Sequence, residues 1–544
     1  MAPKVWLDDA GTVDRLVGDT VSVPADSTLR PAVSVGVALR VAAAEAAKSR
    51  TLATAFGEDV LPELDISADE YPLLSSQPRN DRAATFARGS FEEDIPARLV
   101  YLYTGPSVRL TWMFTFSREH LVAQYRAFVE ADEQTANQAE PEILYFYETS
   151  SRAISARVFQ HNPDEGAMEQ VSFPLPAAAY PVEAPTGLPV GFPLPWNAPV
   201  NGNISTQGNN TMAVNGTTRQ PFVVGVVDGG GEFAAAENSP EQLVTNIFYF
   251  CNYMHDFFLM LGFDEESGNF QTLNVTGGGR GADPVHAFAH PNPVFGTANM
   301  ATRADGQFAV MNMGLVAATG RHTANDADVV FHEFVHGVSN RLVGGMRDAN
   351  ALEEPQSGAM GEGWSDYFAL TIRNFARDDE RTVTGSWVVN SRKGIRQRPY
   401  DSAYPGKFGH IGLGRGQVAG AGNADLSYRQ VHAVGEIWCA ALIEATRNVV
   451  EALGDDKRRG YRITWQAVVD GMKLTPKNPS MLEARDAVLA ALAALPGLTE
   501  DERARVRTAA WRAFADFEMG ADASCPNASF TGCSGGSKVP SDAV

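Results

Sequence analysis

Cysteine is scarce in this sequence. Its 544 residues include four cysteines, and no Cys-x-x-Cys pair occurs among them. This scarcity argues against a cysteine-based zinc site and against a dithiol redox motif. Cys525 and Cys533 are near enough in sequence to close a short loop, whereas Cys251 and Cys439 lie in apolar helical stretches and are expected to be buried thiols.

Positive charge is also in short supply. Lys and Arg number 44 against 65 Asp and Glu, which gives a formal net charge of −21. Nucleic acids and anionic membranes attract basic surfaces, so this balance argues against both as partners. It is typical of a soluble enzyme.

Long uninterrupted apolar runs are absent as well. The segment 239–261 begins as a capped helix and is long enough to cross a bilayer, but Asn246, Asn252, His255 and Asp256 interrupt it. We therefore expect a core helix, in which His255 and Asp256 are structural polar groups. The N-terminus has no apolar stretch of the kind found in secretory signals, so no signal peptide is visible.

The length allows two to four domains. Residues 36–56 have a helical pattern, residues 108–116 alternate as a strand does, and residues 125–130 and 143–148 are further strand candidates. We predict an N-terminal α+β module over 1–150, a β-rich catalytic lobe over 151–345, an α-helical catalytic lobe over 346–520 and a tail over 521–544. Small residues predominate in that tail, so we expect it to be partly disordered.

The segment 329–337 contains His-Glu-x-x-His within an apolar run. Residues four apart lie on one face of a helix, so His332 and His336 can direct two imidazole nitrogens at one ion. Glu333 is placed to reach a water bound to that ion rather than the ion itself. This pattern suits zinc with an open coordination position. The alternative is an amphipathic helix with two partly buried histidines.

Two features of the surrounding sequence weaken that alternative. Thr323 or Asn325 can cap the helix, and two glycines at 344–345 can end it. Downstream, Glu362 and Asp366 are again four residues apart in a mostly apolar segment. Glu362 can supply the third protein ligand that zinc requires, and Asp366 can accept the second N–H of His332.

The segments 332–342 and 358–366 together resemble the fungalysin metallopeptidases, relatives of thermolysin. The resemblance continues in segments at 245–249, 255–256, 268–270, 305–307, 431–438 and 478–480, and so spans roughly residues 150 to 520. It implies a thermolysin-like catalytic unit, in which a β-rich lobe precedes the zinc helix and an α-helical lobe follows it. It also implies a secreted enzyme made as a zymogen, with residues 1–150 as a pro-region-like module.

The resemblance assigns further residues to the site. His432 matches the histidine that stabilises the oxyanion, and Arg396 matches an arginine that binds the substrate carbonyl, with Arg398 as its competitor. An edge strand within 294–315 is expected to pair with the substrate backbone, with Ala298 and Asn299 as the contacts. Ile395 and Val329 are expected to line the pocket that follows the cleaved bond.

The sequence departs from the thermolysin pattern at one position. Thermolysin has a tyrosine nine residues before the ligand glutamate, and this sequence has Glu353 there. Tyr428 is a candidate for the missing second oxyanion donor. An acidic residue that orients His432 is not found at the expected spacing, although Asp425 is near.

The function predicted is that of a zinc-dependent endopeptidase with one catalytic zinc ion and a preference for an apolar residue after the cleaved bond. Its partners are protein or peptide substrates, and we expect a monomer without a membrane span. Calcium is not indicated by any motif. Two alternatives are a latent or non-catalytic zinc-binding protein whose N-terminal module mediates binding, and a zinc exopeptidase. Family resemblance favours an extracellular location, although the sequence alone leaves an intracellular one open.

Overall fold

The computed structural model describes residues 4–7, 13–17, 31–48, 71–76, 83–91, 93–103, 108–118, 123–131, 141–148, 154–183, 185, 188, 192–197, 203–225, 230–274, 276–375, 377 and 380–543. The chain divides into two compact units. The first contains residues 1–153 and 228–230, and the second contains residues 154–227 and 231–544. Each unit has its own buried apolar core. Both combine helices and strands, in agreement with the predicted mixture of α and β structure.

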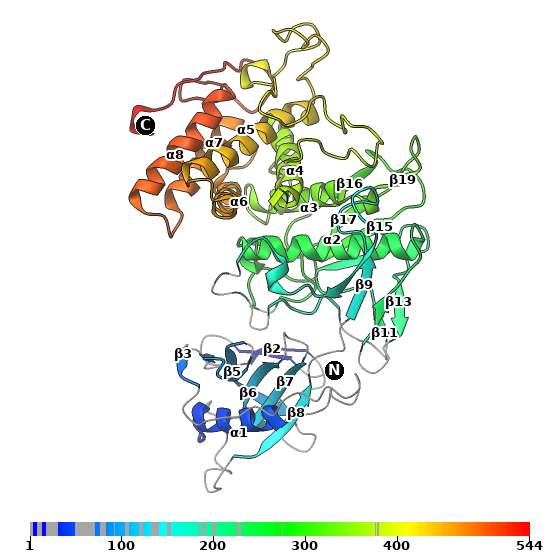
Figure 1. The fold of residues 1–544 in the computed structure, drawn as a ribbon, viewed down its shortest axis with the longest axis vertical. Coiled ribbons are helices and arrows are strands. Elements are labelled where there is room, and N and C mark those ends of the chain that lie inside the picture. Colours follow the sequence, from blue (N-terminus) through cyan, green and yellow to red (C-terminus); the bar gives the residue numbers. More distant parts are fainter. Residues whose placement is uncertain are drawn as a thin grey trace. The chain divides into compact units, whose positions relative to one another are not determined.

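The first unit is built around a sheet of six antiparallel strands in the order β3-β4-β5-β6-β7-β8. Helix α1 (Val35–Lys48) packs on β6 and β7 (Figure 1). Alternate residues of β6 are buried, among them Trp112 and Phe114, as the sequence pattern predicts for a strand with one face on a core. The strands, which include the separate β1–β2 hairpin, are β1 (Lys4–Leu7), β2 (Val13–Val17), β3 (Leu73–Ser76), β4 (Ala84–Phe86), β5 (Ile95–Tyr103), β6 (Val108–Arg118), β7 (Ala123–Glu130) and β8 (Ile143–Glu148).

These elements confirm the predicted strands at 108–116, 125–130 and 143–148. They confirm the predicted helix as far as Lys48, and the remainder of its predicted range lies outside the described residues.

The second unit begins with sheet structure. A four-stranded sheet has the order β12-β15-β17-β16; its first three strands run parallel, and β16 is antiparallel at the edge. The edge strand expected within 294–315 is therefore present. The strands are β9 (Ile154–Val158), β10 (Glu169–Phe173), β11 (Asn203–Ser205), β12 (Thr211–Asn215), β13 (Val223–Gly225), β14 (Glu232–Phe233), β15 (Val285–Ala289), β16 (Ala298–Ala301), β17 (Ala309–Met313), β18 (Leu315–Val316) and β19 (Arg321–His322).

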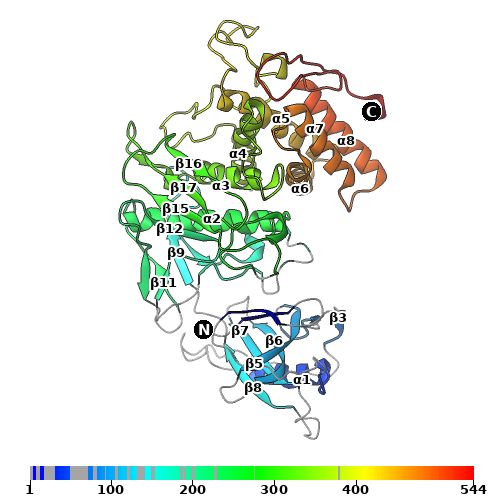
Figure 2. The same ribbon diagram turned by 180° about the vertical axis from the view of Figure 1, so that it is seen from behind.

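Helices α2 and α3 lie beside this sheet, and helices α4 to α8 extend from the other side of α3 (Figures 1 and 2). Helix α4 packs on both α3 and α5, and α5 in turn packs on α8. None of the described helices is both long and apolar enough to cross a membrane. The helices are α2 (Pro240–Met260), α3 (Ala327–Leu342), α4 (Pro355–Phe375), α5 (Val431–Ala452), α6 (Lys457–Leu474), α7 (Met481–Ala494) and α8 (Glu500–Asp516).

Helix α3 carries the His-Glu-x-x-His motif and is almost entirely buried. Its N-cap is Asp326, whose carboxylate accepts from the backbone N–H of Asp328. The prediction that Thr323 or Asn325 caps this helix is wrong, because those residues form a separate 3-10 turn just before it. The helix ends before Gly344 and Gly345, which both have positive φ, as the sequence predicts.

The C-terminal segment docks on the unit, so the prediction of a partly disordered tail is wrong for its described residues. Cys525 and Cys533 form a disulfide, whereas Cys251 and Cys439 are free and buried. At the start of α4, the backbone N–H of Gln356 donates to the carbonyl of Ala528 at 2.7 Å, and its side-chain amide donates to the carbonyl of Ser529 at 2.6 Å. These bonds attach the segment to the helix that carries Glu362.

Candidate metal centre

Three potential metal ligands converge between α3 and α4. Nε2 of His332 lies 3.0 Å from Nε2 of His336 and 3.3 Å from Oε2 of Glu362, and Nε2 of His336 lies 3.6 Å from Oε1 of Glu362. Ligands about 2.0–2.1 Å from a tetrahedral zinc ion are about 3.3 Å from one another. The residues therefore fit such an ion in both donor type and spacing, and they are one ligand fewer than a tetrahedral zinc ion takes.

The charges around this cluster also suit a cation. Burial alone would raise the pKa of Glu362, but His336, His332 and Arg396 hold it well below its ordinary range. Burial likewise opposes ionisation of Asp366, whose pKa is held well below its ordinary range by Arg396 and His332. Both carboxylates are thus ionised at neutral pH.

Asp366 fixes the orientation of His332. Its Oδ1 lies 2.8 Å from Nδ1 of His332. An ionised carboxylate can only accept, so the proton of a neutral His332 is on Nδ1 and the lone pair of Nε2 points into the cluster. The hydrogen bond predicted between these two residues is present.

Glu333 is buried next to the cluster but is not bonded to it. Within the described chain its carboxylate makes no side-chain hydrogen bond or ion pair, although only 6% of the residue is exposed. Burial, with Glu362 adding to it and His332 and Arg396 opposing it, raises the pKa of Glu333 to about 7. A carboxyl group with such a pKa can accept and return a proton near neutral pH.

His432 lies at the N-terminal end of α5, with Nε2 3.4 Å from Oε2 of Glu362. Its Nδ1 is 3.0 Å from the side-chain oxygen of Gln430, which also accepts from the backbone N–H of His432. Gln430 is the N-cap of α5 and orients the imidazole, so Nε2 faces the cluster. The sequence reasoning considered only an acidic residue for this task and missed Gln430; its place directly before the helix is the signal that marks it.

Arg396 reaches the site, whereas its competitor Arg398 does not. Nε and Nη2 of Arg396 donate to the two oxygens of Asp366 at 2.6 and 2.9 Å, and Nη2 lies 3.6 Å from Oε2 of Glu362. Arg398 pairs with Asp425 at 2.7 Å. In this structure the fork of Arg396 is directed at Asp366, and the hydroxyl of Tyr400 donates to the same carboxylate. Sequence reasoning missed Tyr400, and nothing in the local sequence marks it.

Glu436, one helical turn after His432, supports the loop that holds Arg396. It accepts from the backbone N–H of Gln397 at 3.0 Å and from the hydroxyl of Tyr404 at 3.1 Å. Burial raises the pKa of Glu436 to about 7, against the opposing hydrogen bonds and the charge of Arg396.

Neither Glu353 nor Tyr428 supplies a second oxyanion donor. Glu353 is exposed, and its backbone N–H donates to the side chain of Asn478. Tyr428 is fully buried, with its hydroxyl 3.5 Å from that of Tyr404. The suggestion that Tyr428 is this donor is therefore wrong.

The edge strand β16 runs beside α3. A side chain at Gly337, directly after His336, would approach the methyl carbon of Met300 to 2.8 Å. Ala298 is 7% exposed. The side chain of Asn299 donates to the carbonyl of Phe295 and accepts from Asn312, both at 2.9 Å. Because β16 is an edge strand, its outer backbone groups are open to pairing.

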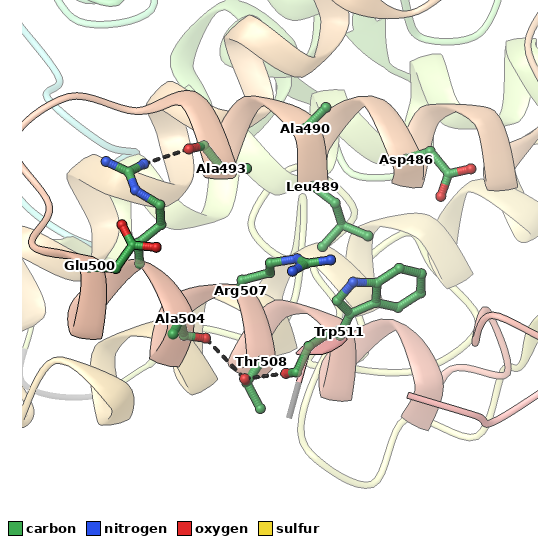
Figure 3. Close-up of a pocket in the computed structure, with 11 residues that line it drawn as sticks. Asp486, Leu489, Ala490, Ala493, Glu500, Ala504, Arg507, Thr508 and Trp511 are labelled. Atoms are coloured by element: carbon green, nitrogen blue, oxygen red, sulfur yellow. Dashed lines mark hydrogen bonds between the residues drawn. The ribbon is translucent and has the colours of Figure 1, made fainter. Parts of the chain in front are cut away.

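Two cavities lie elsewhere in the second unit, and no residue of the metal cluster lines either of them. One, of about 480 Å³, lies between α7 and α8, where Leu489, Arg507 and Trp511 face one another (Figure 3). The other, of about 460 Å³, is lined by Leu315, Arg321 and Trp387 among others.

A His-Glu-x-x-His helix, a glutamate on the following helix and an antiparallel edge strand beside the first helix define a metallopeptidase. Comparison with known proteins identifies its family. The model of the fungalysin metallopeptidase family (M36) matches residues 188–523, and the chain belongs to this family.

Several extracellular enzymes of fungi are similar to the chain. The extracellular metalloproteinase MEP of Fusarium vanettenii is 30% identical over 470 residues, which cover 80% of this chain and 68% of that protein. Extracellular metalloproteinase 9 of Uncinocarpus reesii is 36% identical over 296 residues, 52% of this chain and 44% of that protein. Extracellular metalloproteinase 1 of Trichophyton equinum is 33% identical over 337 residues, 55% of this chain and 51% of that protein.

Proposed function

We propose that this metallopeptidase is a zinc-dependent endopeptidase that cleaves proteins or peptides before an apolar residue. The observation that carries the proposal is the set of separations between His332, His336 and Glu362, which matches three corners of a zinc tetrahedron. We assign one zinc ion to these three residues. When bound there, zinc supplies a Lewis acid that makes water nucleophilic near neutral pH.

The residues around the ion have separate tasks. Glu333 takes a proton from the attacking water and gives it to the leaving amine. Nδ1–H of His432 donates to the side-chain oxygen of Gln430, so it is the protonated imidazolium form that also donates from Nε2 to the oxyanion on the scissile carbonyl. Arg396 positions Asp366, and through it His332. We assign its remaining N–H groups, beyond those bonded to Asp366, to the substrate carbonyl.

Substrate is held as an added strand. The backbone of β16 at Ala298 and Asn299 pairs with the peptide, since this edge borders the helix that carries His336. Val329 and Ile395 form the pocket for the residue after the cleaved bond. Ile395 is 41% exposed, and Val329 lies one helical turn before His332 and Glu333. Both side chains are aliphatic, which is the basis for the apolar preference.

We further propose that the protein acts outside the cell as a monomer and that residues 1–150 are a pro-region-like module of a zymogen. The names of the similar fungal proteins, all extracellular metalloproteinases, support the location. The separate core of the first unit supports treating it as a module. The catalytic unit then has a thermolysin-like arrangement, with a β-rich lobe before residue 345 and an α-helical lobe over 346–520.

The alternative is a latent zinc-binding protein, which would require a zinc ion saturated by protein ligands. The uncommitted carboxylate of Glu333 favours the enzyme. The test is digestion of a peptide library with and without a chelator, followed by restoration with zinc, together with N-terminal sequencing of the active protein. Chelator-sensitive internal cleavage before apolar residues is expected. Trimming from peptide ends only, or zinc binding without any cleavage, would contradict the proposal.

A further inference from the structure

Phe295 is an unusually exposed aromatic residue. Its exposed fraction is 93%, the highest among the exposed large apolar side chains of the described second unit, which are Val223, Leu273, Phe295, Ile395 and Leu474. Burial of a phenylalanine side chain stabilises a fold in proportion to the apolar area removed from water, and this ring removes almost none.

The backbone that carries this ring is held in place. The carbonyl of Phe295 accepts from the side-chain amide of Asn299 at 2.9 Å. The turn is closed by a bond from the N–H of Thr297 to the carbonyl of Val294 at 3.1 Å. Gly296 and Thr297 both have positive φ, 73° and 72°, so the chain bends sharply just before β16 begins. The hydrogen bonds of this turn therefore hold Phe295 in its exposed position.

This turn lies at the end of α3 that carries Val329. The carbonyl of Thr297 accepts from the N–H of Gly314, and the carbonyl of Gly314 accepts from the N–H of Thr323, both at 3.1 Å, just before α3 starts. Further along β16, Met300 contacts Gly337 in the second half of α3. Strand β16 and helix α3 thus run in the same direction, and Phe295 precedes the strand at the end where the helix begins.

The geometry of an extended substrate indicates which of its side chains lies against the ring of Phe295. This step rests on the proposed function, in which the first residue after the cleaved bond points inward to Val329 and Ile395. Successive side chains of an extended peptide point to opposite faces, so the second residue points outward. We propose that Phe295 packs against the side chain of the second substrate residue after the cleaved bond and selects apolar or aromatic side chains there.

The test uses quenched fluorescent peptides with leucine as the first residue after the cleaved bond and with Phe, Leu, Gly or Asp as the second. For the parent enzyme, kcat/KM is expected to be about tenfold higher with Phe than with Gly, the effect of burying part of one ring. In Phe295→Ser that ratio falls to about twofold or less, while kcat/KM for the glycine peptide stays within about twofold of the parent. Phe295→Trp restores the preference.

Leu474→Ala is the matched control, because Leu474 is also an exposed apolar residue, 58% exposed, but lies at the end of α6. It is expected to keep the parent ratio, and the melting temperatures of all variants are expected to agree. An unchanged ratio in Phe295→Ser, or a parent enzyme without any preference at the second position, overturns the inference while the proposed function stands. Failure of the parent to cleave any peptide in a chelator-sensitive manner would contradict the proposed function itself.

Discussion

Helices α3 and α4 meet along a series of charged contacts that differ in character from one end to the other. Asp328, His332 and His336 lie four residues apart on α3, and they face Arg373, Asp366 and Glu362 on α4. At the first contact, Asp328 binds the guanidinium groups of Arg373 and Arg381, and it also accepts from the backbone N–H of Gly385. At the last contact, Nε2 of His332 and Nε2 of His336 both face the carboxylate of Glu362.

A buried charge is matched in two different ways along these two helices. The carboxylate of Asp328 has cationic and N–H donors from the protein itself, so it needs nothing further and stabilises the junction of α3, α4 and the loop after α4. Glu362 and the two histidines instead direct potential ligand atoms at the same point in space, which suits a cation. Identical helix geometry therefore gives a structural ion pair at one end and a candidate metal site at the other.

The largest effect is expected from Glu333→Gln, which separates proton transfer from metal binding. The change removes the basic carboxylate and keeps the size of the side chain, so kcat should fall by about a thousandfold or more, since general base catalysis contributes 10²–10⁴-fold. Zinc content, measured by atomic absorption after dialysis, should remain at one ion per chain. A variant that keeps the parent rate on casein would remove Glu333 from the mechanism.

Asp328→Asn probes the structural end of the series. Removing one partner of a buried ion pair costs about 3–5 kcal/mol. Because Glu165 also pairs with Arg373 at 2.6 Å and with Arg381 at 2.8 Å, the expected loss is at the lower end of this range. Chemical denaturation should show this loss. The matched control is Asp425→Asn, in which the carboxylate that pairs with Arg398 is exposed, and the denaturation midpoint is expected to stay unchanged. Equal losses in the two variants would contradict the distinction drawn between them.

Asp366→Asn tests the middle contact. The amide can still accept from Nδ1 of His332, but it loses the charge that Arg396 and His332 share. Substitutions of such supporting residues lower metal affinity or activity about 10–100-fold. Competition with a fluorescent zinc chelator would measure the affinity. Parent-like affinity would show that the hydrogen bond alone, without charge, is sufficient to hold His332.

Acid should weaken the turn that leads into α3. His322 donates from Nε2 to the carbonyl of His290 and accepts at Nδ1 from the N–H of Ala324, so only its neutral form fits. Burial lowers the pKa of His322 to about 4. Between about pH 6.5 and pH 4 the unfolded chain binds the extra proton and the folded chain does not, so stability falls as pH falls across this window.

The expected size of this acid effect is up to about 2 kcal/mol, measured by urea denaturation at pH 7 and pH 4.5. His322→Asn keeps an N-capping oxygen and removes the titrating group, so the loss on acidification should shrink by that amount. An identical pH dependence in parent and variant would mean that His322 does not titrate in this window.

The sequence predicts features that depend on residues close together along the chain, and it does not predict contacts between distant segments. The positions of His332, His336, Glu362 and Asp366 follow from four-residue spacings on two helices, and the structure brings them together. The strands around residues 108–116 and 143–148 were equally accessible, because alternation of apolar residues is a local signal.

Contacts between distant segments could not be predicted in this way. Tyr400 reaches Asp366 from a loop with no regular pattern, and Gln356 binds a C-terminal segment about 170 residues away. The small residues of that segment suggested disorder, yet its backbone carbonyls satisfy the amide of Gln356. The sequence does not select the cap of α3 for a simpler reason. Three neighbouring residues in that stretch are all good caps, and only the observed bond from the N–H of Asp328 identifies Asp326.

X-ray absorption at the zinc edge of the purified protein, compared with Glu362→Gln, tests whether His332, His336 and Glu362 hold the ion. We expect one zinc ion with two imidazole nitrogens and two oxygens, one of them from solvent, in the parent, and loss of the ion or of one oxygen ligand in the variant. A protein that binds no zinc, or whose zinc environment is the same in parent and variant, would contradict the assignment of His332, His336 and Glu362.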